Sequence, residues 1–172
     1  MKITLLADNQ KSLIAAQDIK KNIKDAQIIS FDSTEYVLPK GNLCLNKKIK
    51  NETKNILNDA VKNCDIIILL THSKIAKLTI NICQELKKPY CATFFEDAQT
   101  IAKFKLKHYL KTFYNLTHFI ICKTEQTENA LTKQKYKAAK YIINDNFSNK
   151  KEALDMFENI ISFYNELYSY KK

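Results

Sequence analysis

The sequence has very little glycine, and Gly41 is the only one among its 172 residues. The G-x-G-x-x-G dinucleotide-binding motif and the P-loop both need several glycines, because their backbones turn tightly and approach phosphate closely. The sequence therefore excludes both motifs, and we predict no bound cofactor.

Arginine is absent, so all 28 basic side chains are lysines, and the formal net charge is +10. Arginine is the usual residue for bidentate recognition of guanine or phosphate, whereas lysine acts as a point charge with little geometric specificity. We expect no sequence-specific nucleic-acid partner, and any binding to nucleic acid should be non-specific and salt-sensitive.

Long apolar runs are also missing. None approaches the roughly 20 residues that a membrane-spanning helix needs. The N-terminal apolar stretch ends at Asp8, which makes it too short for the core of a signal peptide. We therefore expect a cytoplasmic protein.

The cysteines are odd in number and widely spaced, without a C-x-x-C pair. Most lie in or beside apolar runs, which is typical of free buried thiols in cytosolic proteins rather than of disulfides or zinc sites. We predict no metal site. The five are Cys44, Cys64, Cys83, Cys91 and Cys122.

What the sequence does contain is an alternation of short apolar runs and amphipathic segments. The clearest strand is Cys64–Leu70 (CDIIILL), a continuous branched run typical of a strand buried on both faces of a parallel sheet. The other expected strands are 3–7, 26–31, 90–95, 117–122 and 139–143, with a short one at 36–38 inside an irregular stretch, 33–50. Helices are expected at 10–22, 52–62, 72–87, 97–114, 124–135 and from Ser148, as the N-cap, to about 168.

This order predicts one Rossmann-like domain over residues 1–172. It has three layers, with a mainly parallel sheet of about six strands and helices on both faces. The terminal helix, 148–170, is expected to pack back on that domain.

In such sheets a ligand binds outside the carboxyl ends of the strands. The polar residues that follow the expected strands are therefore the candidate ligand-binding residues. They are Asp8 and Asn9; Thr71, His72 and Ser73; Glu96 and Asp97; Lys123, Thr124 and Glu125; and Asn144 to Asn146.

Two of these positions carry chemistry, and each has a structural alternative. His72 is placed to act as a general base or to hold a hydroxyl, unless it is an ordinary loop residue beside Ser73 as a helix cap. Glu96 and Asp97 could do acid–base or nucleophilic work, but they also suit the start of the next helix. Both pairs of alternatives stay open at this point.

The expected helix 97–114 is amphipathic and basic, with Lys103, Lys107 and Lys111 recurring every four residues. Such a helix could lie against anionic lipid headgroups at the inner face of the membrane. It is equally what a core-packed surface helix looks like in a lysine-rich protein.

From Cys64 onward, the order of motifs resembles the N-terminal half of glycosyltransferase family 4 proteins, which have the GT-B fold. The strand CDIIILL ends in Thr71-His72-Ser73, where the family has a histidine-rich strand end. Lys88-Pro89 and YCATFF are similar to the family's lysine-proline and threonine-phenylalanine run. Lys123-Thr124-Glu125 falls at its serine-glutamate turn, and KYIINDNF (140–147) looks like its interdomain strand.

The departures from the family are equally specific. Asn9 to Ser12 replace its glycine pair after the first strand, and Phe95 or Glu96 falls where it has a histidine. The family's C-terminal half, which binds the nucleotide sugar, has no counterpart. The resemblance thus implies an acceptor-side domain that is not catalytic alone. Its partner would be a separate donor-binding chain or a further copy of itself.

A different class stays open as an alternative. Nucleoside deoxyribosyltransferases are small α/β enzymes with a loosely similar strand–helix–Lys-Pro segment, and Glu96 would be the nucleophile in that case. A response-regulator-like domain fits less well, because Thr71 stands where a phospho-accepting aspartate is needed.

Overall fold

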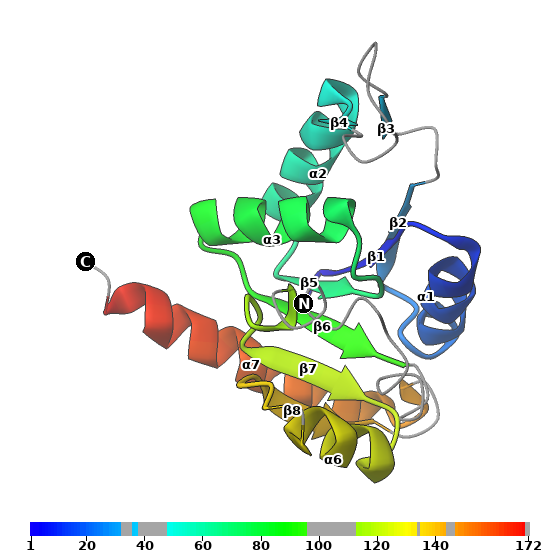
Figure 1. Cartoon of the computed structure of the whole chain (residues 1–172), viewed down its shortest axis with the longest axis vertical. Coiled ribbons are helices and arrows are strands. Elements are labelled where there is room, and N and C mark those ends of the chain that lie inside the picture. Colours follow the sequence, from blue (N-terminus) through cyan, green and yellow to red (C-terminus); the bar gives the residue numbers. More distant parts are fainter. Residues whose placement is uncertain (32–35, 38–47, 96–112, 134, 144–146, 171–172) are drawn as a thin grey trace.

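The computed structural model describes residues 1–31, 36–37, 48–95, 113–133, 135–143 and 147–170. Its main sheet has six strands in the order β2-β1-β5-β6-β7-β8, and every pairing is parallel. The predicted fold class is therefore confirmed (Figure 1). The strands are β1 (Ile3–Ala7), β2 (Gln27–Ser30), β5 (Ile66–Leu69), β6 (Tyr90–Phe94), β7 (Phe119–Cys122) and β8 (Ala139–Ile142).

The centre of the sheet forms the core. All residues of β1, β5, β6 and β7 are buried, as expected for strands covered on both faces. The two edge strands, β2 and β8, are partly exposed. The four central strands are thus covered on both faces, and the two edge strands are not.

Helices cover the sheet. α3 (Lys74–Glu85) and α6 (Glu125–Lys133) connect strands in one direction along the sheet, and α1 (Gln10–Asn22) connects β1 to β2 in the opposite direction. Because parallel crossovers are right-handed, α1 belongs on the face opposite α3 and α6. α2 (Asn51–Asn63) lies beside α3. In Figure 1, α6 lies in front of the β7–β8 end of the sheet and α7 (Lys150–Ser169) behind it.

The α7 helix packs back onto the sheet through aromatic side chains. The Tyr164 ring centroid lies 5.1 Å from that of Tyr90 and 6.1 Å from that of Phe119. The helix is capped by Asn149, whose side chain accepts a hydrogen bond from the Glu152 amide at 3.3 Å. The expected cap at Ser148 was therefore wrong by one residue, because Asn149 is the residue whose side-chain oxygen reaches the third amide.

Two helices end in a left-handed residue that is not glycine. Lys87 follows α3 with φ 52°, and Lys135 follows α6 with φ 60°. At the end of α3 the Lys88 amide donates to the Cys83 carbonyl at 2.8 Å, and the Lys87 amide donates to the Gln84 carbonyl at 3.3 Å. This is the pattern of a helix end that glycine usually forms, and in this glycine-poor chain lysine adopts it.

A second, two-stranded sheet pairs β3 (Tyr36–Val37) with β4 (Lys48–Ile49) in antiparallel fashion. The short strand expected near 36–38 is present. The partner at 48–49 was missed, since two residues give no alternation to detect. No helix among the described residues is long and apolar enough to cross a membrane.

Candidate binding pocket at the carboxyl ends of the strands

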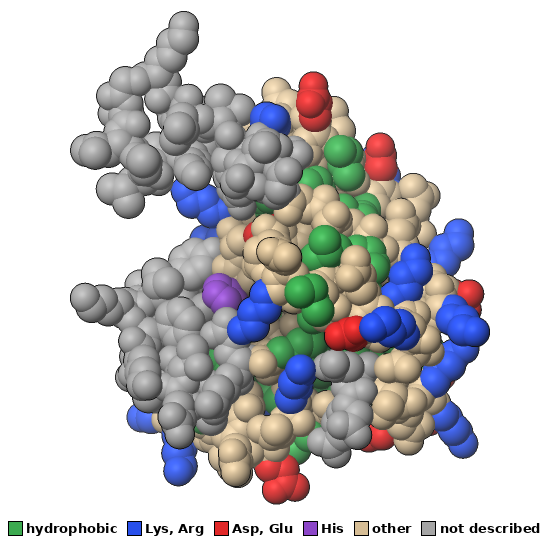
Figure 2. Space-filling view, turned by 90° about the vertical axis from the view of Figure 1, so that its right-hand side faces the viewer, with side chains coloured by type: hydrophobic (Ala, Val, Ile, Leu, Met, Phe, Trp, Pro, Cys, Tyr) green, Lys and Arg blue, Asp and Glu red, His purple; other side chains and the backbone are tan. Residues whose placement is uncertain are grey.

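The carboxyl ends of β1, β5, β6 and β7 meet at one edge of the sheet, where they border a cavity of about 560 Å³ that we call the carboxyl-edge pocket. This is the position at which parallel α/β sheets bind ligands. Figure 2 views this side of the molecule and shows a histidine and lysines beside each other on it. The pocket is lined by Asp8, Asn9, Lys11, Ser12, Ile14, Ala15, Asp18, Leu70, Thr71, His72, Ser73, Thr93, Phe94, Phe95, Tyr114 and Lys123.

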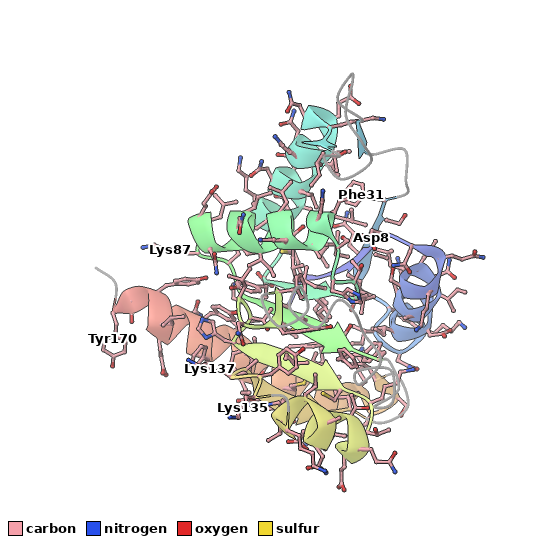
Figure 3. The ribbon with its side chains drawn as sticks, viewed as in Figure 1. Asp8, Phe31, Lys87, Lys135, Lys137 and Tyr170 are labelled. Atoms are coloured by element: carbon pink, nitrogen blue, oxygen red, sulfur yellow. The ribbon has the colours of Figure 1, made fainter. Side chains whose placement is uncertain are left out.

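The β1 side of the pocket is fixed by a reciprocal helix cap. The Ser12 amide donates to Asn9 Oδ1 at 2.8 Å, and the Asn9 amide donates to Ser12 Oγ at 3.2 Å. Asn9 Nδ2 also donates to Asp8 Oδ1 at 3.1 Å. Asp8 is half-buried at the end of β1, and its label in Figure 3 lies at the start of the connection to α1. These bonds hold one carboxylate and one amide side chain at the edge of the pocket.

The α1 wall adds residues spaced three to four positions apart, which share one helix face. They are Lys11, Ile14, Ala15 and Asp18. Ile14 is 52% exposed, which is unusual for so large an apolar side chain, and it lies on the pocket side. Asp18 pairs with Lys21 Nζ at 2.7 Å, so its charge is partly compensated within the helix.

The β5 side contributes Thr71, His72 and Ser73. Ser73 caps α3, because its Oγ accepts the Ala76 amide at 3.2 Å. The His72 ring centroid lies 6.5 Å from that of Phe113 in an edge-to-face arrangement. Ser73 therefore caps the helix and His72 lines the pocket, while the role of His72 as a base or as the partner of a hydroxyl stays a prediction.

Buried aromatic and hydroxyl groups hold the β6 side of the pocket in place. The Tyr114 hydroxyl donates to the Thr93 carbonyl at 3.1 Å, and Thr93 Oγ1 donates to the Leu69 carbonyl of the neighbouring strand at 3.2 Å. The Tyr114 ring lies 5.7 Å from that of Phe94. This network ties β5, β6 and the segment before β7 together beneath the pocket.

Lys123 follows β7 but extends over the end of β6. Its ammonium nitrogen lies 5.1 Å from the centroid of the Phe95 ring, a cation–π distance. The side chain therefore extends along the sheet edge from β7 toward β6, where it lines the pocket.

The structure brings together six of the predicted site residues: Asp8, Asn9, Thr71, His72, Ser73 and Lys123. Two others do not line the pocket. Thr124 instead caps α6, since its Oγ1 accepts the Thr127 amide at 3.2 Å, and Glu125 is exposed in the first turn of that helix.

The remaining candidates lie outside the described residues. They are Glu96 and Asp97, the basic positions Lys103, Lys107 and Lys111, and Asn144 to Asn146. Their suggested roles stay predictions.

Sequence reasoning missed the α1 wall and the aromatic residues under the pocket. Within the expected helix 10–22, Leu13, Ala16 and Ile19 are spaced for one apolar face, and Ile14 lies outside that stripe. The available signal was Ile14, a large apolar residue that lies outside the buried face of a helix beside a strand end. Tyr114 had no comparable signal, because its role depends on packing against Phe94.

The structure bears on the state of the cysteine thiols and on possible metal ligands. The thiols of Cys64, Cys83, Cys91 and Cys122 are free and buried, and burial raises the pKa of each. None of them lines the carboxyl-edge pocket. Among the residues that the structure describes, no three His, Cys, Asp or Glu side chains gather closely enough to hold a metal ion.

Solved structures with a fold similar to that of this chain include two proteins, one from Anabaena and one from Methanocaldococcus jannaschii. The Anabaena protein Alr3699/HepE, solved with UDP and glucose and also with UDP-glucose, matches with a TM-score of 0.60 and 16% identity. The match covers 84% of this chain and 44% of HepE. No protein-family model and no curated protein matches the sequence.

The UDP-GlcNAc 2-epimerase of Methanocaldococcus jannaschii matches with a TM-score of 0.58 and 12% identity, over 84% of this chain and 46% of the epimerase. The chain thus spans less than half the length of either protein. Its fold resembles about half of each of these GT-B-like proteins. Membership of glycosyltransferase family 4, and correspondence to the acceptor-side half, stay predictions.

Proposed function

We propose that this chain is the acceptor-binding half of a GT-B-like glycosyltransferase, and that it binds a sugar acceptor in the carboxyl-edge pocket. The observation that supports this most directly is the convergence of Asp8, Asn9 and His72 on one 560 Å³ cavity. Carboxylate, amide and imidazole groups hydrogen-bond to hydroxyls, and the partly apolar wall from Ile14 to Phe95 suits the carbon face of a sugar ring.

In the proposed reaction, His72 is the general base. An acceptor hydroxyl held by His72 would attack the anomeric carbon of a nucleotide sugar. The bond from that carbon to the diphosphate oxygen breaks, the nucleoside diphosphate leaves, and the hydroxyl proton passes to the imidazole. Asp8 and Asn9 would orient the acceptor, which is the main contribution that a binding half can make to rate.

The donor nucleotide sugar would come from a second domain, supplied by a partner chain or by another copy of this chain. The chain matches less than half of each nucleotide-sugar protein. In the resembled family the other half binds the nucleotide. On this proposal the chain alone binds acceptor sugars and does not transfer a sugar residue.

The test is ligand-observed NMR on the full chain with glucose, N-acetylglucosamine, UDP and UDP-glucose. We expect saturation transfer to a free sugar and none to UDP, with His72→Ala weakening the sugar signal at least several-fold. His118→Ala is the matched control, because His118 is exposed and packs against Phe163 of α7, away from the pocket. Binding of UDP that His72→Ala abolishes would instead identify this chain as the donor-binding half.

The structure does not describe Glu96, the nucleophile of the deoxyribosyltransferase alternative. An activity assay therefore tests that alternative. Release of free base from a deoxyribonucleoside, lost in Glu96→Ala, would favour that activity. No release by the wild-type chain would remove it.

A further inference from the structure

The charged groups of the carboxyl-edge pocket are divided between its two sides. The α1 side carries the carboxylates of Asp8 and Asp18 with Lys11, and the only charged lining residue contributed from the β7 side is Lys123, among the residues that the structure describes. Asp18 is engaged by Lys21 at 2.7 Å. Asp8 and Lys123 therefore carry opposite charges on opposite sides of the pocket, and Lys11 is a second cation on the Asp8 side.

The strand order sets the separation of these two groups. Asp8 follows β1, and the Lys123 ammonium lies over Phe95 at the end of β6, two strands away through β5. With neighbouring strands about 4.8 Å apart, the ends of β1 and β6 beside these two groups are about 10 Å apart along the sheet edge. That gap holds a single sugar ring together with one phosphate group.

Lys11 and Lys123 are the lysines that line the pocket among the described residues, and Lys123 is the one held over an aromatic ring, so we assign the anion to Lys123 rather than to a helix N-terminus. The caps at both neighbouring helices already use their own side chains, with Asn9 Oδ1 bound to the Ser12 amide and Ser73 Oγ bound to the Ala76 amide. The Phe95 ring, in turn, favours an ammonium that stays in place above it. A lysine preorganised in this way loses less freedom when it binds phosphate than an unrestrained one.

We propose that the ligand of this pocket is a glycosyl phosphate. Its sugar hydroxyls donate to Asp8, its ring lies beside His72 and Thr71, and its phosphate pairs with the Lys123 ammonium. This inference rests on the proposed function and specifies its substrate class. The same chemistry is offered by a soluble sugar phosphate and by a sugar joined through phosphate to a lipid.

The experiment is calorimetric titration of the full chain with glucose, glucose 1-phosphate, inorganic phosphate, and an alkyl phosphodiester of glucose as the lipid-like form. Each ligand is titrated into wild type, Lys123→Met, Asp8→Asn and Lys137→Met. Lys137 is the matched control, because it is exposed and does not line the pocket, and Figure 3 shows it near the start of β8 at the opposite edge.

We expect glucose 1-phosphate to bind at least ten-fold more tightly than glucose. Lys123→Met should remove that difference, Asp8→Asn should weaken both ligands, and Lys137→Met should change neither. Tighter binding of the alkyl phosphodiester than of glucose 1-phosphate would support a lipid-linked ligand. Tighter binding of glucose 1-phosphate would support a soluble sugar phosphate.

Equal affinities for glucose and glucose 1-phosphate would overturn the inference, while glucose binding that still depends on Asp8 and His72 would leave the proposed function standing. Inorganic phosphate binding as tightly as the sugar phosphate would also overturn it, because the carboxylate side would then contribute nothing. No binding of any sugar would overturn both proposals.

Discussion

The ammonium nitrogen of Lys123 lies 5.1 Å from the centre of the Phe95 ring, although the two residues follow different strands of the sheet. Phe95 is half-buried, and its ring contacts Phe147 at 6.4 Å between centroids. The lysine therefore rests on an aromatic surface that is itself packed in place, which fixes a positive charge inside the pocket.

Replacing Phe95 with leucine should weaken binding of the phosphorylated ligand without changing binding of neutral glucose. A cation–π contact is worth about 0.5–1 kcal/mol at a partly exposed site, which corresponds to about a two- to five-fold change in the dissociation constant. Calorimetry with glucose 1-phosphate and glucose measures both. Phe163→Leu on α7, where the side chain is 39% exposed, is the control. A loss of the same size for both ligands would mean that Phe95 contacts the sugar instead.

Replacing Lys87 with glycine should stabilise the protein. Lys87 occupies a left-handed conformation with φ 52° at the end of α3, which costs a residue with a Cβ about 1–2 kcal/mol. Glycine avoids that cost but gains entropy in the unfolded chain, so the expected net gain is about 0.5–1 kcal/mol in urea unfolding. Lys62→Gly, inside the last turn of α2, should instead destabilise by about 1 kcal/mol. Destabilisation by both variants would contradict the assigned helix end.

Alanine substitutions at Asn149 and Ser148 should show which of these two adjacent residues caps α7. Asn149→Ala should lower the free energy of unfolding by about 0.5–2 kcal/mol, since its side chain accepts the Glu152 amide. Ser148→Ala should have almost no effect, because the exposed Ser148 is not the cap. Urea unfolding of both variants measures this, and the opposite ranking would place the start of α7 one residue earlier.

The stability of the protein should fall in alkaline solution partly through Cys64. Burial raises the pKa of this thiol to about 11, against about 8.5 in an unfolded chain. Below pH 8.5 the neutral thiol is present in both states. Between pH 8.5 and 11 it ionises only on unfolding, so stability is lost as the pH rises.

Urea unfolding of wild type and Cys64→Ala at pH 8 and pH 10.5 isolates this contribution. Other groups with a pKa raised by burial, such as the half-buried Tyr168 with a pKa of about 12, also lower the stability of both proteins in alkaline solution. Between pH 8 and pH 10.5, the unfolding free energy of the wild type should therefore fall by more than that of Cys64→Ala. Parallel pH profiles would show that Cys64 does not titrate on unfolding.

The strands of the main sheet could be predicted from the sequence because the central strands are continuous apolar runs. The run Ile66–Leu69 is fully buried at the centre, and such uninterrupted apolar runs leave little ambiguity. The pair at 48–49 gave no such signal, and the start of α7 depended on which of two adjacent polar residues points its oxygen at Glu152. The pairing at 48–49 and the N-cap of α7 depend on local backbone geometry, which residue type alone does not determine.

The pocket was predicted in part. Strand-end position alone selected Asp8, His72 and Lys123, because parallel strands bring their carboxyl ends to one edge. The same rule also selected Glu125, which is exposed in the first turn of α6 and does not line the pocket. It also omitted Asp18 and Tyr114, which reach the pocket from a helix face and from the segment before β7.

The pocket is built from four strand ends that are far apart along the chain, from Asp8 after β1 to Lys123 after β7. A ligand that spans them can bind only when β1, β5, β6 and β7 are already paired. Binding should therefore raise the free energy of local opening across the whole middle of the sheet. The backbone amides of β5 and β6, which lie between the two charged groups, should then exchange their hydrogens more slowly with solvent, although the ligand never touches most of them.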